Sequence, residues 1–203
     1  ACSVCVADLD SDGDMDIVSA SGDDDAITWY ENNGSANPSW SAADITTNAD
    51  LARAVFAADM DNDGDIDIIS ASNNDNTIAW YENNGAADPS FTAADIATNA
   101  SGPWSIFAAD LDSDGDMDIV CSANFSNSIV WYENNGAADP SWSTATVGTG
   151  ANGATGVFVA DLDSDGDMDI IAAAADNDKI RWYENNGAAD PSWAAADIAT
   201  NAD

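Results

Sequence analysis

The sequence of 203 residues has no histidine, and only three of its side chains are cationic at neutral pH: Arg53, Lys179 and Arg181. Three cations cannot form the basic patch that neutralises nucleic-acid phosphates or binds an anionic membrane surface, so both kinds of partner are excluded. The lack of histidine also excludes His-based catalytic triads and His-ligated metals. No apolar run approaches the roughly 18 residues of a membrane span, which argues against membrane insertion.

Against these three cations stand 38 Asp and Glu residues, which give a formal net charge of −35. So acidic a composition is typical of disordered chains. Here 45% of the residues are hydrophobic and eight are Trp, which favours a packed core. We therefore expect a folded protein in which the acidic residues have a specific role.

An internal repeat organises the whole sequence. Acidic clusters begin every 51 residues, at Asp8, Asp59, Asp110 and Asp161. Trp-Tyr pairs and a Pro recur with the same spacing, and no insertion or deletion breaks the register. The sequence therefore predicts a single repeat domain over 1–203, made of the repeats 1–51, 52–102, 103–153 and 154–203.

Within one repeat the pattern of residues favours short strands. In the second repeat they are expected at 54–58, 67–70, 77–81 and 90–96, with an Asn-Gly turn after the third. Four strands in about 50 residues is the size of a propeller blade. The predicted fold is all-β, with four tandem four-stranded antiparallel blades of β-propeller type. The sequence leaves open whether they form a closed four-bladed ring, part of a larger ring or an open array.

Each repeat contains the same acidic loop, with Asp at positions 1, 3, 5, 7 and 9 around a Gly at position 6. Two carboxylates about 6 Å apart repel by about 3 kcal/mol at an effective dielectric constant near 20, and a hard divalent cation reverses that energy. Alternating oxygen ligands around a Gly suit Ca²⁺ better than Mg²⁺. We predict one Ca²⁺ per repeat, four in total. The predicted metal residues are Asp8, Asp10, Asp12, Asp14, Asp16, Asp59, Asp61, Asp63, Asp65, Asp67, Asp110, Asp112, Asp114, Asp116, Asp118, Asp161, Asp163, Asp165, Asp167 and Asp169.

The loop differs from an EF-hand, because position 12 is not Glu and strands are expected on both sides of it. Without that Glu, the Asp at position 9 is expected to close the ligand shell. Positions 1, 3, 5 and 9 would then supply side-chain oxygens. Position 7 would supply a backbone carbonyl and leave its carboxylate outward.

The D-x-D-x-D-G-x-x-D-I loop after an apolar strand, followed by a W-Y-E-N strand, resembles the FG-GAP/VCBS repeats of extracellular β-propellers. The resemblance covers all four repeats. It implies one Ca²⁺ per blade, an extracellular or cell-surface location, and adhesive or carbohydrate-associated roles. Propellers of this family usually have seven or eight blades, whereas this sequence has four repeats. Open blades would expose apolar faces and strand edges, which favours self-association.

Two sets of aromatic residues recur in the repeats. The Trp of each Trp-Tyr pair lies mid-strand and is expected in the core. A second set follows a Pro-Ser turn and provides candidate stacking platforms for carbohydrate, namely Trp40, Phe91, Trp142 and Trp193. One Glu per repeat could suggest a glycosidase carboxylate pair, but its place in every Glu-Asn-Asn-Gly segment indicates a turn residue. Because a single catalytic site should break the repeat and no break is found, no enzyme activity is predicted.

The cysteines and the glycosylation motifs do not follow the repeat. Cys2, Cys5 and Cys121 lack the fourth ligand of a zinc site; Cys5 is expected to be a small core residue, and disulfide pairing stays open. The N-x-[ST] acceptors are Asn33, Asn99 and Asn124, which would carry glycans only in an organism that glycosylates its proteins.

Two functions follow from these features. The first is a non-enzymatic, extracellular, calcium-stabilised structural or adhesive protein that self-assembles end to end into a fibre. The alternative is a lectin-like carbohydrate-binding module. The expected partners are copies of the same chain or surface glycans.

Overall fold

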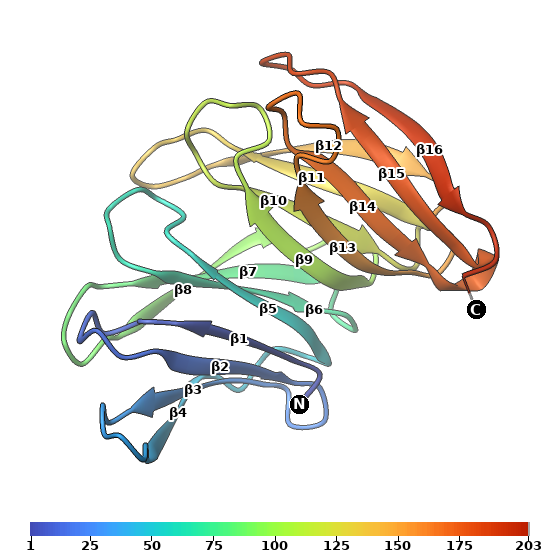
Figure 1. The fold of residues 1–203 in the computed structure, drawn as a ribbon. Helices are drawn as coiled ribbons and strands as arrows, with labels where there is room; N and C mark the ends of the chain where they lie inside the picture. Colours follow the sequence, from blue (N-terminus) through green and yellow to red (C-terminus); the bar gives the residue numbers. More distant parts are fainter. Residues whose placement is uncertain (203) are drawn as a thin grey trace. The chain divides into compact units, whose positions relative to one another are not determined.

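The computed structural model describes residues 1–202, which form sixteen strands in four sheets (Figure 1). Every sheet has four antiparallel strands that pair in sequence order, and each repeat contributes one sheet. The predicted all-β class with four-stranded antiparallel blades is therefore confirmed. The described residues contain one short helical segment, the 3₁₀ helix η1 (Ala175–Asn177), and no helix in them could cross a membrane.

The strand bounds repeat closely from sheet to sheet. The first two sheets contain β1 (Ser3–Ala7), β2 (Asp16–Ser21), β3 (Ala26–Asn32), β4 (Trp40–Thr46), β5 (Ala52–Ala58), β6 (Asp67–Ser72), β7 (Thr77–Asn83) and β8 (Phe91–Ala97). The other two contain β9 (Pro103–Ala109), β10 (Asp118–Ala123), β11 (Ser128–Asn134), β12 (Trp142–Thr149), β13 (Ala154–Ala160), β14 (Asp169–Ala174), β15 (Lys179–Asn185) and β16 (Trp193–Ala199).

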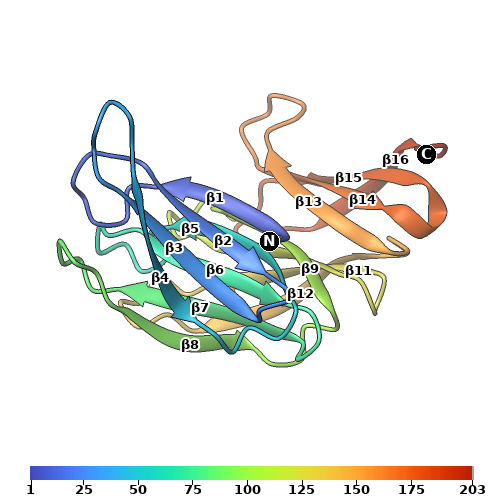
Figure 2. The ribbon, with the colours of Figure 1, turned by 90° about the horizontal axis from the view of Figure 1, so that it is seen from below.

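The chain divides into two compact units, Ala1–Ala100 and Ser101–Asp203, with two sheets in each. In unit 1 the first strands of the two sheets, β1 and β5, lie side by side (Figures 1 and 2). In unit 2, β9 and β13 have the same relation. Each unit is therefore a pair of sheets whose neighbouring faces close on one another.

The core of unit 1 forms between its two sheets. Val18, Ile27 and Trp29 of the first sheet are buried against Ile68 and Tyr81 of the second. Full burial of such a side chain stabilises the fold by about 1.5–3 kcal/mol. Unit 2 has an equivalent core between its own sheets. In each unit the core therefore lies between the two facing sheets.

The turn after the third strand is longer than the Asn-Gly signal indicates. β7 continues to Asn83, and a loop over 84–90 precedes β8. The side-chain oxygen of Asn84 accepts hydrogen bonds from the N–H groups of Ala86 (3.3 Å) and Ser90 (3.0 Å). These bonds close the loop and set where the fourth strand begins.

Candidate metal centre

The acidic loop of each repeat joins the first and second strands of its sheet. In the second repeat, Asn62 at position 4 has φ 60° and Gly64 at position 6 has φ 98°. A Cβ atom on Gly64 would meet nothing within 4 Å, so the backbone angle rather than lack of space requires glycine there. The two positive φ angles turn the chain back on itself within a few residues.

In every repeat three Asp residues offer carboxylate oxygens that lie within 4.8 Å of one another. Positions 1 and 3 belong to each group, and the third member is position 5 in the first and fourth repeats but position 9 in the second and third. The groups are Asp8, Asp10 and Asp12; Asp59, Asp61 and Asp67; Asp110, Asp112 and Asp118; and Asp161, Asp163 and Asp165. The structure thus brings together members of the predicted side-chain ligand set, three at a time.

Backbone N–H groups of the loop hold these carboxylates in place. In the second repeat, Asp63 N–H donates to Oδ1 of both Asp59 (3.2 Å) and Asp61 (3.3 Å), and Gly64 N–H donates to Asp59 Oδ2 (3.0 Å). The Asp65 N–H donates to Asp63 Oδ1 (2.9 Å). The same four bonds recur in the other three repeats. Because a carboxylate has about four lone-pair sites, it can accept these bonds and still bind a cation.

The Asp at position 9 is buried and links the loop to the third strand. In the second repeat, Asp67 Oδ2 accepts a hydrogen bond from Met60 N–H (3.1 Å) and Oδ1 accepts one from Asn83 N–H (2.8 Å). The equivalent pairs of bonds are present in the other repeats. This Asp therefore fixes the distance between the loop and the strand, whatever else it binds.

The electrostatics of the loop disfavour so many bare charges. Burial raises the pKa of Asp67 to about 6 and that of Asp118 to about 7, against the opposing effect of their backbone hydrogen bonds. Burial, followed by the charges of neighbouring Asp residues, also raises the pKa of Asp61 and of Asp112. Burial disfavours the charged form of each carboxyl group, and the neighbouring carboxylates add to this effect.

The donor set fits a hard divalent cation. Each group consists of carboxylate oxygens alone, the ligand type that suits Ca²⁺, Mg²⁺ and Mn²⁺. Two carboxylate oxygens within 4.8 Å of one another repel by about 3 kcal/mol or more at an effective dielectric constant near 20, and a bound dication would replace that repulsion by attraction. The Asp clusters can therefore hold metal ions, and calcium is compatible with them.

The carboxylates at position 7 lie outside all four groups. Each of them contacts the turn that follows the third strand. The Asp65 carboxylate lies against Gly85, where φ is 64°, so closely that a Cβ atom on Gly85 would collide with it. The same contact recurs in the other repeats, and it explains why the Glu-Asn-Asn-Gly segment ends in glycine.

Sequence reasoning missed the first Asn of that segment. In the second repeat, Asn83 Nδ2 donates to the carbonyl of Ile66 in its own loop (3.0 Å) and to that of Leu9 in the loop of the first repeat (2.8 Å). Its Oδ1 accepts from Gly85 N–H (3.1 Å). In unit 2, Asn185 Nδ2 bonds in the same way to Leu111, 74 residues away. One side chain thus joins two consecutive acidic loops. The sequence signal for this role is that the same Asn recurs every 51 residues.

The predicted aromatic stacking platforms divide into two kinds. Phe91 packs edge-on against Trp29 (6.4 Å between ring centroids), and Trp193 packs in the same way on Trp131 (6.5 Å). These two rings therefore serve sheet packing. Trp142 is half-buried, and Trp40 is 44% exposed. Of the four candidates, Trp40 presents the most accessible ring.

The remaining candidates have ordinary surroundings. Glu133 accepts a hydrogen bond from the Ser143 hydroxyl of the neighbouring strand (2.6 Å), a contact that stabilises the strand pair. Asn33 and Asn99 are exposed and Asn124 is half-buried, so the glycosylation motifs stay predictions. All three cysteines are free thiols: Cys2 is exposed, Cys121 is buried, and burial raises the pKa of Cys5 to about 12.

Three segments of the chain match the model of the FG-GAP-like repeat, at residues 8–70, 59–121 and 120–172. Together they extend over most of the chain. The protein belongs to the FG-GAP-like repeat family. The first two matches begin at the first Asp of an acidic loop and end in the second strand of the next repeat, so the family pattern includes the candidate metal loops.

Comparison of structures places this FG-GAP-like repeat protein beside a larger enzyme. The periplasmic gluconolactonase of Pseudomonas aeruginosa is similar to it with a TM-score of 0.58 and 14% sequence identity, over 96% of this chain and 56% of that one. The chain thus spans little more than half of the enzyme's length, and the likeness concerns the fold alone. No curated protein sequence matches the chain.

Proposed function

We propose that the chain is a non-enzymatic, calcium-stabilised structural protein that acts outside the cell and assembles end to end with copies of itself. The observation that carries this proposal is a repeated apolar face that is covered where two sheets pair within a unit and bare on the first and the last sheet of the chain. Its occupant is taken to be a second copy of the chain.

Unit 1 shows the difference at equivalent positions of two sheets. Val55 in β5 is 5% exposed because the first sheet packs on it, whereas Val4, at the same position in β1, is 64% exposed. Val6, Tyr30 and Trp40 lie on the same sheet as Val4, and Val4, Tyr30 and Trp40 line a common apolar groove of about 380 Å³. Val4, Tyr30 and Trp40 correspond to Val55, Tyr81 and Phe91 of the second sheet, which belong to the core between the two sheets or pack against it.

Unit 2 has the complementary face on its last sheet. Leu111 is 2% exposed, and its equivalent Leu162 is 43% exposed. Phe158 in β13 is also exposed, with one edge of its ring packed against Phe107 of β9 (4.9 Å between ring centroids). Equivalent positions of the repeats carry similar residues. The first sheet of one copy can therefore cover the last sheet of another copy, as the second sheet covers the first in unit 1. Contacts of this head-to-tail kind generate filaments when they do not close into a ring.

Calcium would make the sheets stable enough to carry such contacts. At a free concentration ten times the dissociation constant, each bound ion stabilises the fold by about 1.4 kcal/mol, so four add roughly 6 kcal/mol. Extracellular calcium modules commonly bind at about 10⁻⁴–10⁻³ M, concentrations found outside cells rather than in the cytosol. A calcium affinity in this range supports an extracellular location.

The test is light scattering and electron microscopy of the full chain in calcium and in excess EDTA. We expect polymers in calcium that the Val4→Asp variant prevents, because a charge would be buried at the contact. Thr92→Asp, which adds the same charge at an exposed position of β8, should assemble like the wild type. A constant monomer mass in calcium contradicts assembly, and an unchanged melting temperature in EDTA contradicts the role of calcium.

Carbohydrate binding is the second candidate, favoured by the exposed ring of Trp40 beside Tyr30. Sugar rings stack on such aromatic faces, while acidic side chains can accept bonds from their hydroxyls. A glycan array probed with the wild type and with Trp40→Ala separates the two functions. Carbohydrate binding is supported if the wild type binds a glycan as a monomer and the Trp40→Ala variant does not.

A further inference from the structure

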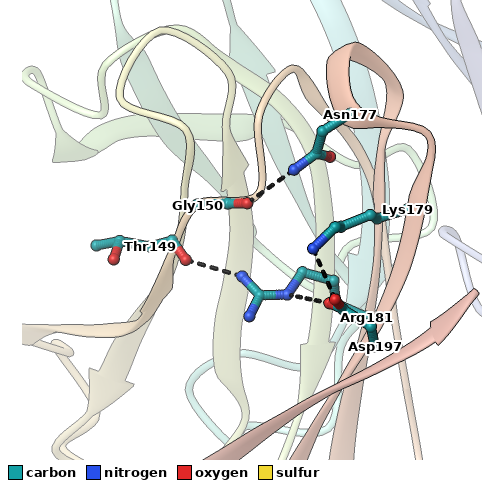
Figure 3. Close-up of polar contacts among 6 residues, drawn as sticks. All are labelled: Thr149, Gly150, Asn177, Lys179, Arg181 and Asp197. Atoms are coloured by element: carbon teal, nitrogen blue, oxygen red, sulfur yellow. Dashed lines mark hydrogen bonds and ion pairs between the residues drawn. The ribbon is translucent and has the colours of Figure 1, made fainter. Parts of the chain in front are cut away.

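Two of the three cationic side chains of the protein bind one carboxylate in unit 2, and one of them also reaches the neighbouring sheet. Lys179 Nζ and Arg181 Nε, both from β15, bind the two carboxylate oxygens of Asp197 in β16 at 2.6 and 3.1 Å (Figure 3). Arg181 Nη1 also donates to the carbonyl of Thr149 (2.8 Å), and its guanidinium carbon lies 5.4 Å from the centre of the Tyr183 ring. The guanidinium is thus held by a carboxylate, a carbonyl and an aromatic ring.

The corresponding place in unit 1, two repeats earlier, keeps the partners but lacks the cations. Asp95 and Tyr81 correspond to Asp197 and Tyr183, whereas Thr77 and Ala79 stand where unit 2 has Lys179 and Arg181. The strand register is the same in both sheets. Ala79 pairs with Asp95, and Arg181 pairs with Asp197, in each case next to a bulge that follows an Ile.

A pocket of about 310 Å³ occupies this place in unit 1. Its lining includes the Asp75 and Asp95 side chains and the buried ring of Tyr81, together with Thr77, Ala79 and Asn48. No Lys or Arg lines it. Asn48 and Asp75, which line this pocket, correspond to Gly150 and Asn177, which are joined by a hydrogen bond in unit 2.

The chemistry of this pocket selects a cation with an apolar stem. Asp95 offers a bidentate carboxylate, the geometry that guanidinium groups match best. The Tyr81 ring and the Ala79 methyl group offer an apolar surface for the alkyl stem, and an aromatic face attracts a cation. The net charge of −35 also raises the local concentration of cations at the protein surface.

We propose that the unit 1 pocket binds an organic cation, a guanidinium or ammonium group on a short alkyl stem, with its head on Asp95 and its stem on Tyr81. The chain itself supplies this group in unit 2, through Arg181, and leaves the place open to an external ligand in unit 1. The ligand is either a free amine or the Arg or Lys side chain of a polypeptide. This site is separate from the acidic loops and does not depend on assembly.

Calorimetric titration of the full chain in saturating calcium tests the proposal. The probe is agmatine, a guanidinium on a four-carbon amine, and N-butylurea serves as a neutral control of similar shape. We expect agmatine to bind and N-butylurea not to bind. Asp95→Asn should weaken agmatine binding about tenfold or more, because it removes a charge-assisted hydrogen-bond partner. Asp23→Asn, which removes one exposed charge elsewhere in unit 1, should bind agmatine like the wild type.

A second variant transfers the unit 2 arrangement into unit 1. Thr77→Lys combined with Ala79→Arg should fill the pocket from within, abolish agmatine binding and keep or raise the melting temperature. A capped Gly-Arg-Gly peptide compared with agmatine shows whether the site favours a polypeptide or a free amine. The proposal is overturned if agmatine fails to bind at millimolar concentration, or if Asp95→Asn and the double variant bind it as well as Asp23→Asn does.

Discussion

Replacing Asn83 by Ala tests how much the bond between consecutive loops contributes to stability. The substitution removes two hydrogen bonds donated by Nδ2, to the carbonyls of Leu9 and Ile66, and one accepted by Oδ1 from Gly85. The carbonyl of Leu9 belongs to a buried residue, and it would lose this partner where water has little access. A buried group left without a partner costs about 1–3 kcal/mol.

Asn32 in the first repeat provides a matched control. Its Nδ2 donates to the carbonyl of Met15 (3.1 Å) and its Oδ1 accepts from Gly34 (3.2 Å), so it reproduces the contacts of Asn83 within its own sheet. It makes no bond to another loop among the described residues. We expect Asn83→Ala to lower the free energy of unfolding by about 1–3 kcal/mol more than Asn32→Ala does.

Urea unfolding in saturating calcium, followed by Trp fluorescence, measures both variants. The difference should appear in the urea midpoint without a change in its slope. Asn185→Ala should reproduce the effect in unit 2, because Asn185 Nδ2 bonds to the Leu111 carbonyl at the same distance of 2.8 Å. Equal destabilisation by Asn83→Ala and Asn32→Ala would refute the idea that this side chain joins the loops energetically.

Three further predictions concern the loops and the sheet faces. Gly64→Ala should lower the free energy of unfolding by about 1–3 kcal/mol and weaken calcium binding, because φ is 98° at this position. An unchanged calcium affinity in calorimetry would contradict this prediction. Without calcium, the urea midpoint should fall as the pH rises from about 4 to above 7, since the raised pKa values of Asp67 (about 6) and Asp118 (about 7) make the folded state bind protons that the unfolded state has lost. Excess calcium should reduce that fall. A urea midpoint that rises with pH in EDTA would contradict the prediction. Val55→Ala should lower the free energy of unfolding by about 1–3 kcal/mol, and Val4→Ala should lower that of the monomer by less than about 0.5 kcal/mol. Equal losses for the two variants in thermal unfolding would show that the face around Val4 is covered.

Much of the site could be predicted from the sequence because its chemistry is local. Positions 1, 3 and 6 of the acidic loop lie within a few residues of one another, and the φ angle that Gly64 needs depends on that loop alone. The spacing of the loop also predicts the Asp at position 9 as a member of the ligand set. It does not predict the link from this Asp to the third strand, because Asn83 lies 16 residues away in the sequence.

The aromatic residues illustrate the limit of pattern reasoning. Phe91 and Trp193 follow the same Pro-Ser turn as Trp40, so the sequence gives all of them the same role. In the folded units Phe91 and Trp193 pack against a Trp of the neighbouring sheet, while Trp40 remains exposed. The partner ring lies in another repeat, and no local pattern contains it.

The sequence by itself determined the four repeats, the four short strands of each repeat and the place of the acidic loops, because strand propensity and turn chemistry act over short stretches of chain. The tertiary structure decided which faces are covered, how Asn83 joins two loops, and why Arg181 fills in unit 2 a pocket that unit 1 leaves open. Val4 and Val55 are the same residue at the same position of the repeat, and only a neighbouring sheet makes one of them a core residue.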